Sequence, residues 1–145
     1  MNNIVKLYKE TRSAEEFTKG YLSYLCDLLK QLDTKAIASF IHEFEDAREK
    51  DKTVFLIGNG GSAATASHMA NDIGLDVLKK SGMNRPFRVM SLTDNVPVMT
   101  AIGNDEGYDQ LFFLQLKIHY RPGDKLVVIS ASGNSPTSSS SSVPW

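Results

Sequence analysis

Two short loops rich in glycine, serine and asparagine carry the residue types that could bind a phosphate group. The first reads GNGGS at residues 58–62, and the second reads SASGNS at residues 130–135. Each follows a short apolar run and leads toward an expected helix, so backbone N–H groups and the helix dipole can attract an anion. A single loop of this kind is more simply a tight turn between a strand and a helix. Two such loops at equivalent strand ends favour a phosphorylated ligand.

Neither loop has the spacing of a nucleotide-binding motif. The chain contains no GxxxxGK[ST] pattern, and GNGGS does not match the GxGxxG pattern of dinucleotide-binding folds. The serine hydroxyls can nevertheless donate hydrogen bonds to phosphate oxygens. The expected site is therefore neutral and directional, and it needs no lysine or arginine.

A histidine and an aspartate form a second group that could do chemistry. His68 and Asp72 are four residues apart on one expected helix, so both side chains can reach a single ligand. Two protein ligands are fewer than the three or four of a zinc site. The alternative is a hydrogen bond between the two side chains on the helix surface. We expect the other histidines and the five tyrosines to have solvated, core or interface positions.

The elements that must position these residues alternate between strands and helices. Short apolar or β-branched runs typical of strands lie at 53–57, 87–92 and 125–129. Apolar residues at helical spacing lie between them, at 63–77, 98–102 and 108–120. This alternation predicts an α/β fold with a doubly wound parallel sheet. Ligands bind such sheets at the carboxyl ends of the strands, which is where both loops lie.

The first third of the chain is expected to be helical. Apolar residues recur at helical spacing from about 13 to 32, and again after Asp33 and Thr34, which are typical N-cap residues. We predict an N-terminal helical hairpin over 1–52 as part of the same domain, an α/β part over 53–136, and a serine-rich flexible tail over 137–145. The hairpin carries more apolar side chains than a three-stranded sheet can cover, which predicts self-association.

Composition excludes several classes of protein. The 145 residues include 16 basic and 17 acidic side chains, a net charge of −1, so neither a nucleic-acid partner nor a membrane surface is expected. A single cysteine, Cys26, cannot form an internal disulfide. We see no signal peptide and no apolar run of the length that a membrane span needs. These features predict a cytoplasmic domain.

Taken together, the motifs resemble the sugar isomerase (SIS) domain. GNGGS is followed six residues later by His68, and then come NRP at 84–86, TAIGND at 100–105 and SASGNS. The resemblance covers about residues 20–136. Within the family, the motifs are most similar to those of the phosphoheptose isomerases. It implies a flavodoxin-like three-layer fold, a sugar-phosphate substrate and a homotetramer.

The resemblance also implies a reaction. Phosphoheptose isomerases convert sedoheptulose 7-phosphate to glycero-manno-heptose 7-phosphate for bacterial surface polysaccharides such as lipopolysaccharide. A relative with the same fold associates with the DnaA initiator and has no established catalysis. The alternative function is therefore a non-catalytic binding or scaffold protein.

Individual residues receive roles from the same resemblance. His68 and Asp72 are implied as zinc ligands, and Asp72 also as the base that moves a proton between C1 and C2. The residues implied in sugar-phosphate binding are Asn59, Gly60, Gly61, Ser62, Asp94, Asn95, Ser130, Ala131, Ser132 and Ser135.

Three departures from the family pattern affect these roles. Asp72 is one methylene shorter than the expected glutamate, and Asn95 replaces a carboxylate with an amide. The C-terminal part of the usual fold, with a further glutamine and histidine, is expected to be missing. We therefore expect phosphate binding together with little or no turnover.

Overall fold

The computed structural model describes residues 2–133, which form two compact units that divide between Ser39 and Phe40. Ser135 and the serine-rich tail lie outside the described residues. Among the described helices, none combines the length and the apolar character that a membrane crossing requires.

The first unit contains a helix pair that the sequence analysis did not predict as a pair. Helix α1 (Asn3–Glu10) packs against α2 (Ala14–Lys30), and each has a polar N-cap side chain, Asn2 and Ser13 respectively. Tyr8 and Phe17 meet edge to face at 5.9 Å between ring centroids. Only the α2 helix was expected, because α1 is short.

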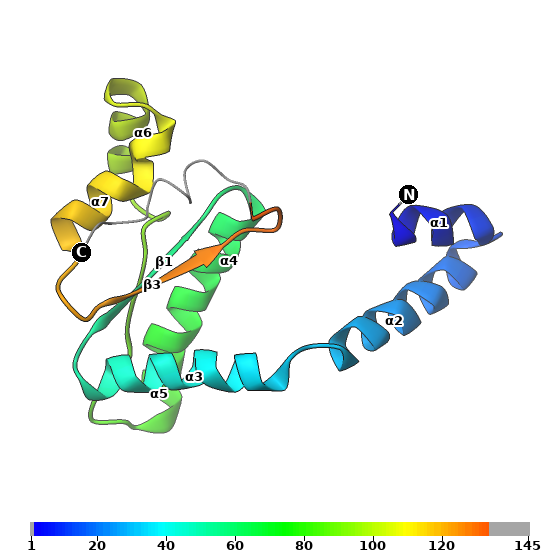
Figure 1. The fold of residues 1–145 in the computed structure, drawn as a ribbon, viewed down its shortest axis with the longest axis horizontal. Coiled ribbons are helices and arrows are strands. Elements are labelled where there is room, and N and C mark those ends of the chain that lie inside the picture. The colour runs from blue at the N-terminus through cyan, green and yellow to red at the C-terminus, as the bar shows by residue number, and fades with distance from the viewer. Residues whose placement is uncertain (1, 134–145) are drawn as a thin grey trace. The chain divides into compact units, whose positions relative to one another are not determined.

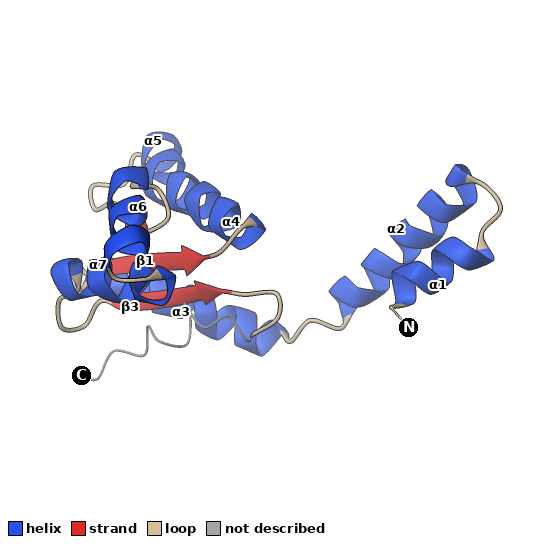
Figure 2. Cartoon of the chain, turned by 90° about the horizontal axis from the view of Figure 1, so that it is seen from above, coloured by secondary structure: helices blue, strands red, loops and turns tan. Residues whose placement is uncertain are grey.

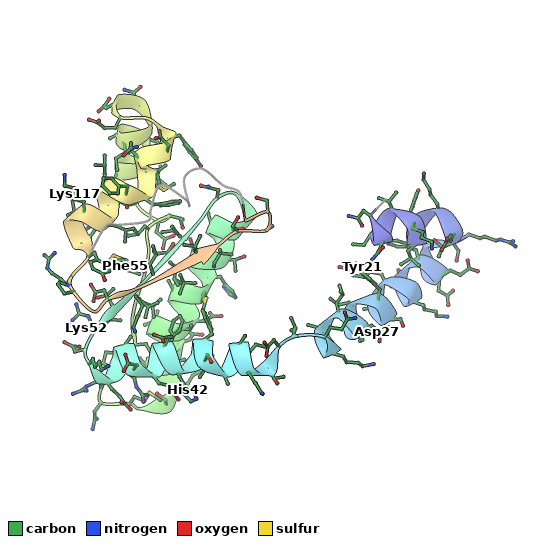
Figure 3. All side chains as sticks on the ribbon, viewed as in Figure 1. Tyr21, Asp27, His42, Lys52, Phe55 and Lys117 are labelled. Carbon is green, nitrogen blue, oxygen red and sulfur yellow. The ribbon has the colours of Figure 1, made fainter. Side chains whose placement is uncertain are left out.

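Helix α3 (Thr34–Glu49) begins where the sequence predicts it. The Asp33 side chain accepts hydrogen bonds from the backbone N–H groups of Lys35 and Ala36, which confirms the predicted cap. Its Phe44 is buried in the second unit, whereas His42 is exposed and pairs with Glu45 (Figure 3). The pairing of α2 and α3 as a hairpin stays a prediction, as does the predicted division into domains.

The second unit is built on a three-stranded parallel sheet (Figure 1). Its strands are β1 (Thr53–Gly58), β2 (Arg88–Ser91) and β3 (Lys125–Ile129), in the order β2-β1-β3. Both neighbours of β1 run parallel to it, and residues 54–58 are buried in the centre. All three predicted strands are present, and the predicted α/β class is confirmed.

Helices cover both faces of this sheet, as the doubly wound class requires (Figure 2). Phe55 and Ile57 of β1 pack against α6 (Val96–Asp105) and α7 (Leu111–His119). The alternate residues Val54 and Leu56 pack against α3 and α4 (Gly61–Ala70). Since successive strand residues point to opposite faces, one central strand supplies both cores.

The helix after β1 is longer and less regular than a single α-helix. Helix α4 continues into a π-helical segment, Asn71–Asp76, and then into α5 (Val77–Ser81). On the other face, a short 3₁₀ segment, Tyr108–Gln110, precedes α7. Both irregular segments carry residues that matter for the candidate site.

Candidate functional site

Most of the predicted binding residues lie at the carboxyl ends of the three strands. Residues 59–62 follow β1, residues 93–95 follow β2, and residues 130–133 follow β3. Because β1 is the central strand, its loop lies between the other two, and neighbouring strands are about 4.8 Å apart. We call these three segments the carboxyl-edge loops. The fold thus gathers small polar residues from three parts of the sequence at one edge.

The loop after β1 depends on glycine for its shape. A Cβ atom on Gly58 would lie 2.7 Å from the backbone carbonyl carbon and oxygen of Ser62, so no larger residue fits without a backbone shift. Gly60 has a φ of 56°, in the left-handed region that glycine favours, and it forms the N-cap of α4. The ten-residue helix α4 then begins at Gly61. Its positive dipole end therefore points at the carboxyl-edge loops.

Asn59 is held by a residue that sequence reasoning did not select. The Tyr108 hydroxyl donates to Asn59 Oδ1 over 3.1 Å, although the two residues are 49 positions apart. Tyr108 begins the 3₁₀ segment directly after Gly107, whose φ is 102°. The only local signal is a tyrosine beside a glycine turn, which is too common to mark a site.

The loop after β2 is fixed to α4 by hydroxyl groups. Ser91 Oγ and Thr93 Oγ1 are 2.6 Å apart, and Ser67 Oγ lies 3.0 Å from Thr93 Oγ1. Ser67 also donates to the Asp94 carboxylate. Asp94 is therefore held in place by the helix that starts at the first loop.

Asn95 has a structural role that explains its residue type. It is the N-cap of α6, and its Oδ1 accepts a hydrogen bond of 3.2 Å from the Val98 N–H. Asparagine and aspartate are both good N-caps, so an amide in place of a carboxylate does not disturb the helix start. A contact between Asn95 and a ligand stays a prediction.

The loop after β3 folds back on itself. Ser130 Oγ accepts a hydrogen bond of 3.0 Å from the Gly133 N–H, and Gly133 has a φ of 70°. Ala131 and Ser132 are exposed in this turn. Three of the four residues predicted for this loop therefore lie at the carboxyl edge, and Ser135 is outside the described residues.

The predicted metal ligands lie elsewhere on α4 and its extension. His68 Nε2 and Asp72 Oδ2 are 3.3 Å apart, and the two side chains are 80% and 49% exposed. His68 is seven residues from the start of α4, about 10 Å along its axis, and about 200° around it from the buried Ala66. The pair therefore points away from the sheet. The structure does not bring it together with the carboxyl-edge loops of the same chain.

Asp72 itself has a defined environment. It belongs to the π-helical segment, and its second carboxylate oxygen accepts from Asn71 Nδ2 over 3.2 Å. π-Helical turns occur frequently at functional sites. Asp72 also lines a surface hollow of about 470 Å³ together with Asp76 and Lys80. Hydrogen bonding to Lys80 holds the pKa of the Asp76 carboxyl below its usual range.

The described residues would supply at most two ligands to a metal ion. A zinc ion bound tetrahedrally at about 2.0–2.1 Å separates two N or O ligands by roughly 3.3 Å, so His68 and Asp72 fit as two ligands. No group of three or more histidine, cysteine, aspartate or glutamate residues able to hold a metal occurs within residues 2–133. A complete zinc site would need ligands from beyond this part of the chain.

Comparison with known proteins identifies the family of this chain. Residues 20–139 match the family model of the SIS domain. The phosphoheptose isomerase of Rhodospirillum rubrum is 48% identical over 82 residues, which are 57% of this chain and 42% of that protein. The phosphoheptose isomerase of Citrifermentans bemidjiense is 36% identical over 122 residues, 81% of this chain and 62% of that protein.

Solved structures show the same similarity. A phosphoheptose isomerase from Neisseria gonorrhoeae has a TM-score of 0.72 and 29% identity, covering 89% of this chain and 67% of that one. One from Francisella tularensis has a TM-score of 0.79 and 25% identity, covering 90% and 68%. The chain thus spans about two fifths to three fifths of the length of these two curated relatives.

Proposed function

The chain belongs to the SIS domain family, and we propose that it binds a sugar phosphate and serves the isomerisation of a heptose 7-phosphate. The gathering of three small polar loops at the carboxyl edge of a parallel sheet carries this proposal. The relatives named phosphoheptose isomerase support the heptose as the sugar. They do not favour the alternative of a non-catalytic scaffold.

In this proposal the carboxyl-edge loops hold the phosphate. The N-terminus of α4 and the loop of Ser130, Ala131 and Ser132 supply backbone and hydroxyl donors at neighbouring strand ends. Hydrogen bonds to a charged acceptor are stronger than those between neutral groups. A phosphate can therefore be held without a neighbouring cation.

The proposed chemistry moves a proton between C1 and C2 through an enediolate, with Asp72 as the base. Asp72 is ionisable, half exposed and paired with His68, so its carboxylate is accessible to a substrate. Because this pair faces away from the sheet, we propose that a neighbouring copy of the chain completes the reaction site. The homotetramer implied by the resemblance is part of this proposal, as is a role in making surface polysaccharide.

We propose His68 and Asp72 as ligands of a zinc ion. A bound zinc ion would stabilise the negative oxygen of an enediolate. Zinc affinity can be measured by calorimetry without any turnover. We expect His68→Ala to weaken zinc binding at least tenfold, and His42→Ala, which alters another exposed histidine–carboxylate pair, to leave it unchanged. Equal zinc affinity in the parent chain and the His68→Ala variant would contradict this ligand assignment.

Calorimetric titration with sedoheptulose 7-phosphate tests the binding proposal. We expect binding of the phosphorylated sugar and none of sedoheptulose itself. Ser132→Ala should weaken binding about five- to thirtyfold, because it removes a hydroxyl donor to a charged group. Ser23→Ala, an exposed serine on α2, is the matched control. Absence of binding at millimolar sugar phosphate would overturn the proposal, and NMR of the sugar measures isomerisation separately.

A further inference from the structure

Tyr108 connects the helical layer over one sheet face to the centre of the carboxyl edge. Its hydroxyl donates to Asn59 Oδ1 over 3.1 Å, and Asn59 is the first residue after the central strand. Tyr108 comes from the segment between α6 and α7, and Asn59 comes from the segment between β1 and α4. The contact therefore joins two loops whose neighbouring residues Ile57, Leu111 and Phe112 also share one hydrophobic core.

The position of this hydrogen bond argues against a role mainly in folding. Tyr108 is 56% exposed, and a hydrogen bond in contact with water adds little to the free energy of unfolding. Buried tyrosine hydroxyls form hydrogen bonds within the core. This exposed hydroxyl instead donates to the side-chain amide of a loop residue 49 positions away in the sequence. It does contribute to the orientation of that amide.

An asparagine side chain can donate and accept, and its rotation decides which group faces a ligand. With Oδ1 accepting from Tyr108, the Nδ2 donor group of Asn59 faces away from the tyrosine. A side chain already held in one orientation loses less entropy when a ligand binds. The phenol hydroxyl thus prepares Asn59 for binding before the ligand arrives.

We propose that Tyr108 is a positioning residue for the sugar-phosphate site, and that it acts through Asn59. This inference rests on the proposed function, because it concerns the same carboxyl-edge loops. It adds the segment of Gly107 and Tyr108 as a further border of the site. It also predicts that the tyrosine hydroxyl, and not the ring, carries the effect.

A double-mutant cycle with sedoheptulose 7-phosphate tests this inference, with dissociation constants measured by calorimetry. Tyr108→Phe removes only the hydroxyl and should weaken binding about two- to tenfold. In an Asn59→Ala background the same change should have no effect, because the group through which it acts is gone. Tyr8→Phe, on the exposed Tyr8 of α1, is the matched control and should bind like the parent chain. Urea unfolding of each variant checks that the fold is retained.

The outcomes separate the two proposals. Failure of the parent chain to bind the sugar phosphate overturns the proposed function and this inference with it. Binding by the parent chain with the same affinity in Tyr108→Phe overturns this inference alone. A loss of the same size in both the Asn59 and the Asn59→Ala backgrounds also overturns it, because Tyr108 would then act independently of Asn59.

Discussion

At the scale of single residues, polar side chains of the carboxyl edge make hydrogen bonds within the protein. Asn95 caps α6, Ser130 closes its own turn, and Asp94 is held by Ser67. A side chain held in this way is ordered before any ligand binds, which lowers the entropic cost of binding. Structural and binding roles can therefore be separated only by measuring stability and affinity on the same variants.

Asn95 is the residue at which a structural role and a binding role can be separated most clearly. Asn95→Ala removes the acceptor for the Val98 N–H and should lower the free energy of unfolding by about 1 kcal/mol. Asn95→Asp keeps an acceptor at the same position and should retain most of the stability. Urea unfolding followed by circular dichroism measures both. A stability unchanged in Asn95→Ala, together with weaker sugar-phosphate binding, would assign Asn95 to the ligand instead of the cap.

At the scale of elements, the junction between β1 and α4 is set by a close backbone approach. A methyl group on Gly58 would lie 2.7 Å from the Ser62 backbone, whereas one on Gly61 would meet nothing within 4 Å. We expect Gly58→Ala to lower the free energy of unfolding by about 1–3 kcal/mol, the usual cost of overpacking. Gly61→Ala should change the stability much less, and thermal unfolding compares the two. Equal stability of the two variants would mean that the loop between β1 and α4 can shift without lowering the free energy of unfolding.

A second pair of elements, α3 and β3, is joined by charges. Lys125 Nζ lies 2.6 Å from Glu43 Oε2 and 3.5 Å from Asp46 Oδ2. The hydrogen bond to Glu43 raises the pKa of Lys125, and a hydrogen bond from Lys50 lowers the pKa of Asp46. The folded state thus holds the lysine proton more tightly than the unfolded state does. Its contribution is complete at neutral pH and is lost as the pH rises through the raised pKa.

Lys125→Met should therefore reduce the free energy of unfolding at pH 7. The difference in the free energy of unfolding between this variant and the parent chain should shrink at alkaline pH, where the native lysine also loses its charge. The contribution of Asp46 has the opposite dependence, because its lowered pKa means that stability is lost as the pH falls through that value. Urea unfolding from acidic to alkaline pH measures both dependences. The exposed Lys117→Met is the control (Figure 3). A difference independent of pH would show that the ion pairs do not stabilise this junction.

At the scale of the whole molecule, α2 carries an exposed apolar stripe. Leu22, Leu25, Leu29 and Leu32 recur at intervals of three and four residues from α2 into the turn that follows it, and each is between 38% and 57% exposed. An amphipathic helix normally buries such a stripe against another surface. One apolar residue of the predicted hairpin, Phe44, is instead buried in the core of the second unit.

Self-association through this stripe is the expected outcome. Light scattering of the parent chain at tens of micromolar should give a mass above that of one chain. Leu22→Glu combined with Leu29→Glu places charges in the stripe and should lower that mass, while Lys19→Glu combined with Lys30→Glu changes charge at other exposed α2 positions and should not. A monodisperse monomer for the parent chain would contradict the predicted assembly.

The sequence alone determined the features that depend on neighbouring residues. The three strands and the helices between them follow from hydrophobic spacing, and the Gly- and Ser-rich loops follow from residue type, so these elements were predicted close to their observed bounds. The short helix α1 was missed although Ile4, Leu7 and Tyr8 recur at helical spacing, because eight residues are a short window for such a pattern. Only the tertiary structure decided which distant groups meet. Tyr108 reaches Asn59 across 49 positions and Ser67 reaches Asp94 across 27, because the packing of whole layers sets these contacts. The same packing turned one face of α4 to the sheet and left His68 and Asp72 on the other.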